Sequence, residues 1–90
     1  MALTWPFKDP DEVLDYEIDW SDRLGTDTIA TSTYTVPAGI TKNSSTNDDT
    51  TTTVWLSAGT EGETYSILNR ITTAGGRTMD QTVKLKVKSK

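Results

Sequence analysis

Residues 13–20 read Val-Leu-Asp-Tyr-Glu-Ile-Asp-Trp, and their apolar and acidic side chains alternate. Successive side chains of a β-strand point to opposite faces, so one face receives the apolar set and the other the carboxylates. The apolar set is Leu14, Tyr16, Ile18 and Trp20, and the acidic set is Asp15, Glu17 and Asp19. A period of two over four repeats predicts a strand with one buried face and one solvated face.

The remainder of the chain contains similar runs separated by turn residues. Further strands are expected at residues 28–36, 51–57, 64–73 and 78–88, with residues 40–42 as a candidate short strand. Ile29 and Tyr34 belong to the same predicted strand but have opposite parity, which predicts a bulge or bend between them. No segment shows a convincing helical period.

The connections carry the residues that turns require. Residues 21–27 are expected to turn, with Gly25 at a positive φ. Residues 43–50 have no apolar member and predict an exposed, mobile loop. Gly75 and Gly76, between Ala74 and Arg77, predict a tight hairpin, because a Gly-Gly pair readily supplies two positive φ angles.

The composition favours a thin, two-layered β structure. Threonine, which is β-branched and favours extended backbone, accounts for 18 of the 90 residues. Only 33% of the residues are hydrophobic, which suits a core between two sheets better than packed helices. About seven short strands with regular turns predict an all-β, immunoglobulin-like Greek-key β-sandwich. Tyr65, near the start of the penultimate strand, stands where that fold places its corner tyrosine.

The first twelve residues differ from the rest of the chain. They show no periodicity, and Pro6 and Pro10 each restrict the preceding residue to extended backbone. We therefore expect an extended N-terminal arm at residues 1–12 and a sandwich domain at residues 13–90. Trp5 and Phe7 flank Pro6, and such large apolar side chains must pack on a partner or on their own domain. Trp5, Pro6 and Phe7 are candidate partner-binding residues under the first alternative.

Two residue types that often serve in catalysis and metal binding are missing. The chain has no Cys and no His, which excludes disulfides, a Cys or His nucleophile and the usual zinc ligands. The acidic runs at residues 9–12 and 47–49 lack the ligand spacing of a calcium loop. The carboxylates of residues 13–20 repeat about every 6.5–7 Å, as in some glycosidases, but nothing predicts the cleft that catalysis needs. We expect no enzymatic activity, no metal site and no cofactor.

Charge is unevenly distributed along the chain. The net charge is −4, with eight acidic and two basic residues in residues 1–30 but three acidic and six basic residues in residues 61–90. The acidic balance argues against nucleic acid as a partner. No run reaches the ~20 apolar residues of a membrane helix, and no signal peptide is expected at the start.

A second ladder of charges alternates along the last predicted strand, at Lys84, Lys86 and Lys88. In an immunoglobulin-like sandwich the first strand often lies beside the last, so we expect this lysine ladder to pair with the carboxylates of residues 13–20 on one outer face. The alternative is that the two ladders meet between subunits.

Three segments taken in order carry a family resemblance: Lys8–Trp20 (Lys-Asp-Pro-Asp-Glu-Val-Leu-Asp-Tyr-Glu-Ile-Asp-Trp), Thr33–Gly39 (Thr-Tyr-Thr-Val-Pro-Ala-Gly) and Asn69–Thr78 (Asn-Arg-Ile-Thr-Thr-Ala-Gly-Gly-Arg-Thr). They resemble small immunoglobulin-like proteins encoded in the virion structural gene clusters of tailed bacteriophages and prophages, over roughly residues 8–88. The resemblance implies a structural or accessory protein of the virion, made in the bacterial host cytoplasm. It carries over no functional residue.

These observations predict a non-enzymatic module that decorates or reinforces the capsid or the head–tail region. Its expected partners are capsid or other virion structural proteins, with a second copy of the chain as a further candidate and with no nucleic acid and no membrane. The alternative is a carbohydrate- or host-surface-binding module of a phage tail or fibre, using Trp55 and the predicted loop at residues 43–50. Trp55 is therefore a candidate partner-binding residue, while Tyr65, Gly75 and Gly76 are structural candidates.

Overall fold

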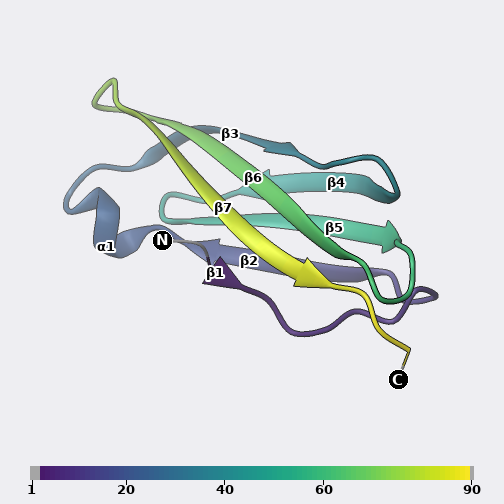
Figure 1. Cartoon of the computed structure of the whole chain (residues 1–90). Coiled ribbons are helices and arrows are strands. Elements are labelled where there is room, and N and C mark those ends of the chain that lie inside the picture. The colour runs from purple at the N-terminus through teal and green to yellow at the C-terminus, as the bar shows by residue number, and fades with distance from the viewer. Residues whose placement is uncertain (1–2, 90) are drawn as a thin grey trace.

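The chain folds into two facing β-sheets (Figure 1). The computed structural model describes residues 3–89, so Met1 and Ala2 of the predicted arm and Lys90 of the predicted domain lie outside the described residues. The elements are β1 (Leu3–Thr4), β2 (Leu14–Asp19), α1 (Ser21–Leu24), β3 (Ile29–Thr35), β4 (Ile40–Asn47), β5 (Thr51–Ala58), β6 (Thr64–Thr73) and β7 (Thr78–Lys86). The strand orders are β1-β7-β6-β3 and β2-β5-β4. The predicted all-β sandwich of about seven short strands is confirmed.

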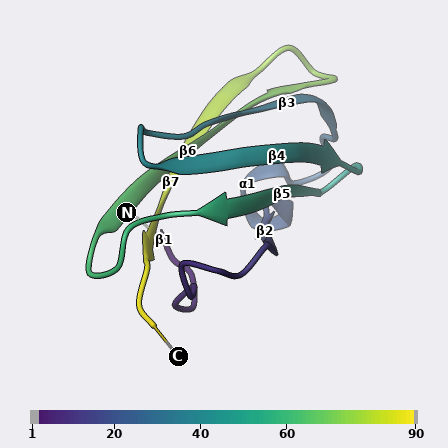
Figure 2. The same ribbon diagram turned by 90° about the vertical axis from the view of Figure 1, so that its right-hand side faces the viewer.

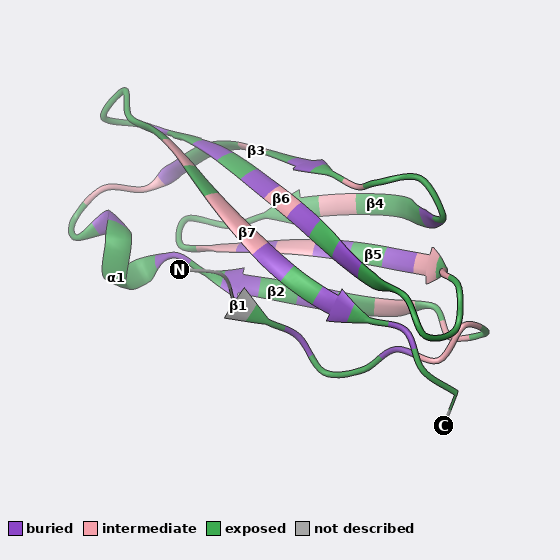
Figure 3. Ribbon diagram, viewed as in Figure 1, coloured by how far each residue is buried: buried purple, intermediate pink, exposed green. Residues whose placement is uncertain are grey.

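Alternation along each strand decides which side chains enter the core. Figure 3 shows this alternation as bands of buried and exposed residues along β6 and β7. In β6 the buried positions run from Tyr65 through Ile67, Asn69 and Ile71 to Thr73, as the period of two predicts. The predicted bulge between Ile29 and Tyr34 is confirmed, because the register of β3 against β6 shifts between Ile29 and Thr31.

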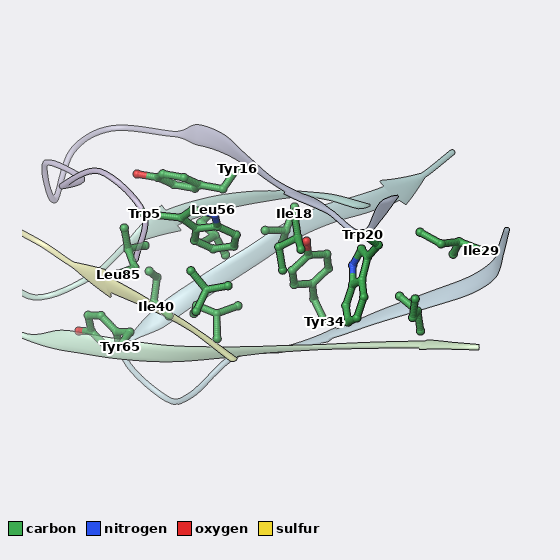
Figure 4. Close-up of a cluster of buried hydrophobic side chains, with 14 of the residues drawn as sticks. Trp5, Tyr16, Ile18, Trp20, Ile29, Tyr34, Ile40, Leu56, Tyr65 and Leu85 are labelled. Atoms are coloured by element: carbon green, nitrogen blue, oxygen red, sulfur yellow. The ribbon is translucent and has the colours of Figure 1, made fainter. Parts of the chain in front are cut away.

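The core lies between the two sheets, which cross each other at an angle (Figure 2). Its centre consists of aliphatic side chains without solvent exposure: Val54, Leu56, Ile67, Ile71, Val83, Leu85 and Val87. Fully burying one such side chain contributes about 1.5–3 kcal/mol. Aromatic residues fill the space toward the ends, where Figure 4 shows Trp5 against Tyr16 and Trp20 beside Tyr34.

Four buried polar side chains connect the two sheets within this core. Asn69 Oδ1 on β6 accepts hydrogen bonds from Trp20 Nε1 at 3.0 Å and from the Thr52 hydroxyl at 2.8 Å. The Thr52 oxygen lies 2.7 Å from the Tyr34 hydroxyl, which donates because the Thr52 proton is already used. Burial raises the pKa of Tyr34 to about 12, so the hydroxyl remains a donor at neutral pH. Sequence patterns gave no sign of this network.

The segment expected to be a mobile loop is mostly a strand, and that prediction is wrong. Residues 43–47 belong to β4, which pairs with β5 as far as Asn47 opposite Thr52. The apolar pattern missed this strand because β4 is an edge strand whose side chains after Ile40 are mostly exposed. Backbone hydrogen bonds to β5 form regardless of side-chain polarity. The connection itself is short, and Asp48 Oδ1 closes it by accepting the N–H groups of Thr50 and Thr51.

One helical turn appears where only a turn was expected. α1 follows directly on Trp20 and ends at Gly25, whose φ of +63° agrees with the predicted positive value. The turn is anchored by Leu24, which is buried, and by Arg23, whose guanidinium lies 4.8 Å from the centre of the Trp20 ring.

Candidate interaction surface

Trp5 belongs to the core of its own domain. Only 8% of its surface is exposed, its ring stacks on Tyr16 at 4.8 Å between centroids, and its Nε1 donates to the Glu17 carbonyl. The backbone before it forms β1, which pairs in parallel with β7. The sequence did not predict β1. Of the two alternatives for the arm, Trp5 follows the second and packs on its own sandwich.

Phe7 lies outside this core. It is 48% exposed, Pro6 before it is also exposed, and the Lys88 ammonium stands 5.8 Å from the centre of the Phe7 ring. The described arm therefore divides its aromatic residues, with Trp5 facing inward and Phe7 facing solvent. Phe7 remains available for contacts with another molecule.

Lys8 secures the arm to the domain in a way the sequence did not reveal. The side chain is fully buried, and its Nζ donates to the carbonyl of Ala58 at 2.7 Å and to that of Asp9 at 2.8 Å. Ala58 ends β5 with a φ of +63°, which is uncommon for a residue other than glycine. Because lysine side chains are normally exposed, nothing in the sequence around Lys8 predicted that this one would be buried.

Trp55 stands on the outer face of the β2-β5-β4 sheet. It is 42% exposed and lies in the central strand, directly opposite Asp15 on β2 and Ser44 on β4. Val13, 53% exposed, precedes β2 nearby. Because the central strand is paired on both sides, the exposed indole is held in a fixed position and offers an apolar surface to a partner.

A row of carboxylates on β2 runs along the same outer face, beginning with Asp15 opposite the indole. Asp15, Glu17 and Asp19 are all exposed there, as the alternation of residues 13–20 predicted. Hydrogen bonds from the backbone and side chain of Ser21 lower the pKa of Asp19, and those from the N–H groups of Thr50 and Thr51 lower the pKa of Asp48. Lowered values keep both groups ionised at neutral pH, the opposite of what a general acid needs. The β2 edge of this face is thus anionic, with Trp55 beside its first carboxylate.

The lysine ladder lies on the other side of the molecule, so the predicted pairing of the two ladders within one domain is wrong. β2 pairs with β5, whereas β7 pairs with β1 and β6 in the opposite sheet. Lys84 and Lys86 point outward from β7, and Lys84 Nζ donates to Ser66 Oγ at 2.6 Å. The sequence predicted the exposed face of each strand correctly, but β1, formed by the arm, takes the place beside β7.

Tyr65 supports the turn that precedes its own strand. Its hydroxyl accepts a hydrogen bond from the Thr60 N–H at 2.9 Å, and its ring packs against Gly39, where a Cβ would stand 3.1 Å from the hydroxyl oxygen. This is the type of contact, from hydroxyl to backbone a few residues upstream, that defines a tyrosine corner.

The Gly75-Gly76 hairpin connects β6 and β7, but only Gly76 has a positive φ, at +92°. Glycine is needed at position 75 for a steric reason, because a Cβ there would lie 2.8 Å from Asp27 Oδ2. The prediction of two positive φ angles is therefore wrong for Gly75. Its N–H donates to Asp27 Oδ1 at 3.0 Å, and Arg77 forms a salt bridge with the same carboxylate at 3.1 Å.

Two classes of site are absent from residues 3–89. No three His, Cys, Asp or Glu side chains in that range come together to hold a metal ion. Within the same range, no helix has the length and apolar character needed to cross a membrane.

The sequence comparison identifies the family. A family model described as podophage GP4 fiber-tail adaptor protein gp77 matches residues 8–86, from the buried lysine of the arm to the last residue of β7. No curated protein matches the chain. The prediction of a structural protein of a tailed-phage particle is confirmed by this match. The chain belongs to the podophage GP4 fiber-tail adaptor protein gp77 family.

Proposed function

We propose that this chain connects a fibre to the tail of a podophage particle and that it does so without enzymatic activity. The observation that carries the proposal is the family match, which spans residues 8–86 and so includes strands of both sheets. The family description names the fibre and the tail. It therefore supports this location over the capsid decoration expected from the sequence.

The structure supports an adaptor role through the placement of its exposed apolar groups. In the described part of the chain, the large hydrophobic side chains left in solvent are Phe7, Val13 and Trp55. Phe7 lies on the arm beside Lys88, while Trp55 lies on the outer face of the other sheet. Aromatic side chains surrounded by polar groups are typical anchors of protein interfaces. Two separate anchors suit a protein that joins two neighbours.

We also propose that the sandwich is immunoglobulin-like. The orders β7-β6-β3 and β2-β5-β4 correspond to the G-F-C and B-E-D strand orders of that fold. The Tyr65 hydroxyl bond to Thr60 supports the same assignment. β1 differs from the constant-type arrangement, because it joins the β7 sheet instead of lying beside β2.

The partner-binding residues in this proposal are Pro6, Phe7 and Trp55. Trp5, which the sequence grouped with them, instead holds the arm on the domain. Because Trp5 is already buried against its own domain, the arm needs no partner to bury this tryptophan. Pro6 and Phe7 are then held in place on the folded domain.

Phage particles that carry substituted forms of this chain test the proposal. Phe7→Ser and Trp55→Ser remove exposed aromatic side chains and should leave filled heads but reduce fibre content by about tenfold or more, since anchor residues dominate interfaces. Thr53→Ser, on the same outer face, is the matched control and should leave fibre content unchanged. Fibre copies are counted by quantitative mass spectrometry, and the chain is located by cryo-EM. Density on the capsid lattice, or full fibre content in both variants, would overturn the proposal.

Carbohydrate binding is a second candidate function, and the geometry around Trp55 favours it. The indole lies between Asp15 and Ser44, so a sugar stacked on the ring would find hydrogen-bond acceptors and a donor at its rim. A titration with host surface glycans, followed by the intrinsic tryptophan fluorescence of the chain, tests it, with Trp55→Ser as the reference. A glycan that binds the unmodified chain but not the variant would support this function, and no binding across a host glycan panel would rule it out.

A further inference from the structure

We propose that the outer face of the β2-β5-β4 sheet docks on the lysine ladder of a second copy of this chain. The first surface, called the acidic face here, consists of Asp15, Glu17, Asp19 and Trp55. The second, called the basic face, consists of Lys84, Lys86 and Lys88. The inference goes beyond the proposed adaptor role, and it is measured on the isolated chain, so either can fail without the other.

Charge complementarity within one sequence is the first argument. Asp15 and Glu17 form no ion pair within residues 3–89, although both are exposed on β2. Lys86 likewise takes part in no ion pair among the described residues. The two faces belong to opposite sheets, so they cannot meet within one molecule. In a pair of copies, the acidic face of one can form ion pairs with the basic face of the other.

The spacing of the charges is the second argument. Side chains on one face of a strand recur every two residues, which is about 6.5–7 Å. The carboxylates follow this repeat on β2, and the lysines follow it on β7 and the residues after it. Two rows of opposite charge with the same repeat can be placed in register, with each lysine facing one carboxylate.

Trp55 gives the contact an apolar group at one end of the carboxylate row. The indole lies directly opposite Asp15, so a lysine that pairs with this carboxylate ends beside the exposed ring. A cation near an aromatic face gains a further attraction. The same chain already uses this contact twice, with Arg23 at 4.8 Å from the Trp20 ring and Lys88 at 5.8 Å from the Phe7 ring.

The contact is of the head-to-tail kind, because each copy offers a different face at its two sides. Such contacts close into a ring or continue as a filament. A three-stranded sheet face measures only about 14 Å by 26 Å from strand spacing and rise. That is less than the ~800 Å² per partner of a stable interface, so association of the free chain is expected at roughly 0.1–1 mM. Attachment to a particle raises the effective concentration of neighbouring copies.

Charge reversal tests the proposal by sedimentation velocity between about 10 µM and about 1 mM chain, a range set by the expected weak association. One variant carries Asp15→Lys and Glu17→Lys, and the other carries Lys84→Glu and Lys86→Glu. Each alone should associate at least about tenfold more weakly than the unmodified chain, because like charges then face each other. An equimolar mixture should restore association, because the intact acidic face of one variant meets the intact basic face of the other.

Two further measurements keep the result unambiguous. Raising the salt from about 0.1 M to about 1 M should weaken association of the unmodified chain, since the Debye length falls from about 10 Å to about 3 Å. Trp55→Ser keeps every charge and should weaken association without a change in far-UV circular dichroism. A chain that stays monomeric to about 1 mM in low salt overturns the proposal and leaves a basic partner protein as the occupant of the acidic face. Unchanged association in either reversed variant, or a mixture that stays monomeric, also overturns it.

Discussion

Trp20 Nε1 donates a hydrogen bond to Asn69 Oδ1 over 3.0 Å, and this contact joins the residue that follows β2 in one sheet to the middle of β6 in the other. Asn69 is fully buried, and its amide nitrogen donates to Ser32 Oγ and to the Thr33 carbonyl. Every hydrogen-bonding position of the Asn69 amide is therefore used. A slip of one residue in either sheet would break the set, so the network specifies how the sheets face each other.

The buried network predicts a large difference between two neighbouring threonines of β5. Thr52→Val should lower the free energy of unfolding by about 1–3 kcal/mol, because the Tyr34 hydroxyl loses its partner in the core. Thr53→Val makes the same chemical change on the outer face and should alter it by less than about 0.5 kcal/mol. Urea unfolding followed by circular dichroism measures both. Equal effects would show that the network adds no stability.

Truncating the side chain of Trp5 should lower stability far more than truncating that of Phe7. Trp5→Ala removes a buried ring stacked on Tyr16 and should cost about 3–5 kcal/mol, a large part of the stability of a small domain. Phe7→Ala should cost less than about 1 kcal/mol, because the ring is half exposed. Melting temperatures and urea midpoints distinguish the two. A Trp5→Ala chain as stable as the unmodified one would show that the arm detaches in solution.

Replacing Lys8 should lower the free energy of unfolding more than replacing any exposed lysine. Lys8→Met keeps most of the side-chain volume but leaves the Ala58 and Asp9 carbonyls without this charged donor, which should cost about 1.5–3 kcal/mol. Lys86→Met on the outer face of β7 is the matched control and should change stability by less than about 0.5 kcal/mol. Limited proteolysis gives a second measure, since cleavage near residues 6–10 should accelerate in Lys8→Met alone. Resistance equal to that of the control would contradict the assigned role.

Asp27 should make stability depend on pH between about 4 and 2. Hydrogen bonds from the Thr73 side chain and the Thr28 N–H, aided by Gly75 and Arg77, lower the pKa of Asp27 to about 2 from the ordinary 3.8. A carboxyl with a lowered folded-state pKa stabilises the fold above its unfolded pKa, and the contribution is lost as the pH falls through the folded value.

The comparison of Asp27→Asn with the unmodified chain checks this pH window. The variant should be the less stable one at pH 5–7, and the difference should shrink steadily from about pH 4 to about pH 2. Asp11→Asn, at an exposed position of the arm, is the control and should change the free energy of unfolding at pH 7 by less than about 0.5 kcal/mol. Urea midpoints at pH 2, 3, 4 and 7 give the curve. A difference between Asp27→Asn and the unmodified chain that stays constant with pH would show that the Asp27 cluster does not depend on ionisation.

The sequence alone determined the strands whose side chains alternate. Residues 13–20 predicted β2 with its buried and acidic faces, and the repeats in residues 64–73 and 78–88 predicted β6 and β7. The exposure of Trp55 followed from the same parity. These features are local, because a period of two records which side of one strand is buried.

Only the tertiary structure decided which strands are neighbours. The carboxylates of β2 and the lysines of β7 have matching patterns, yet β1 and not β2 lies beside β7. β4 pairs with β5 although its side chains are polar, and Trp5 and Lys8 are buried although no period marks them. Strand pairing uses backbone groups that every residue except proline possesses in full, so side-chain patterns do not encode the partner. Which face of a strand is buried can be predicted from neighbouring residues. Which strands pair depends on distant segments that burial and hydrogen bonding bring together.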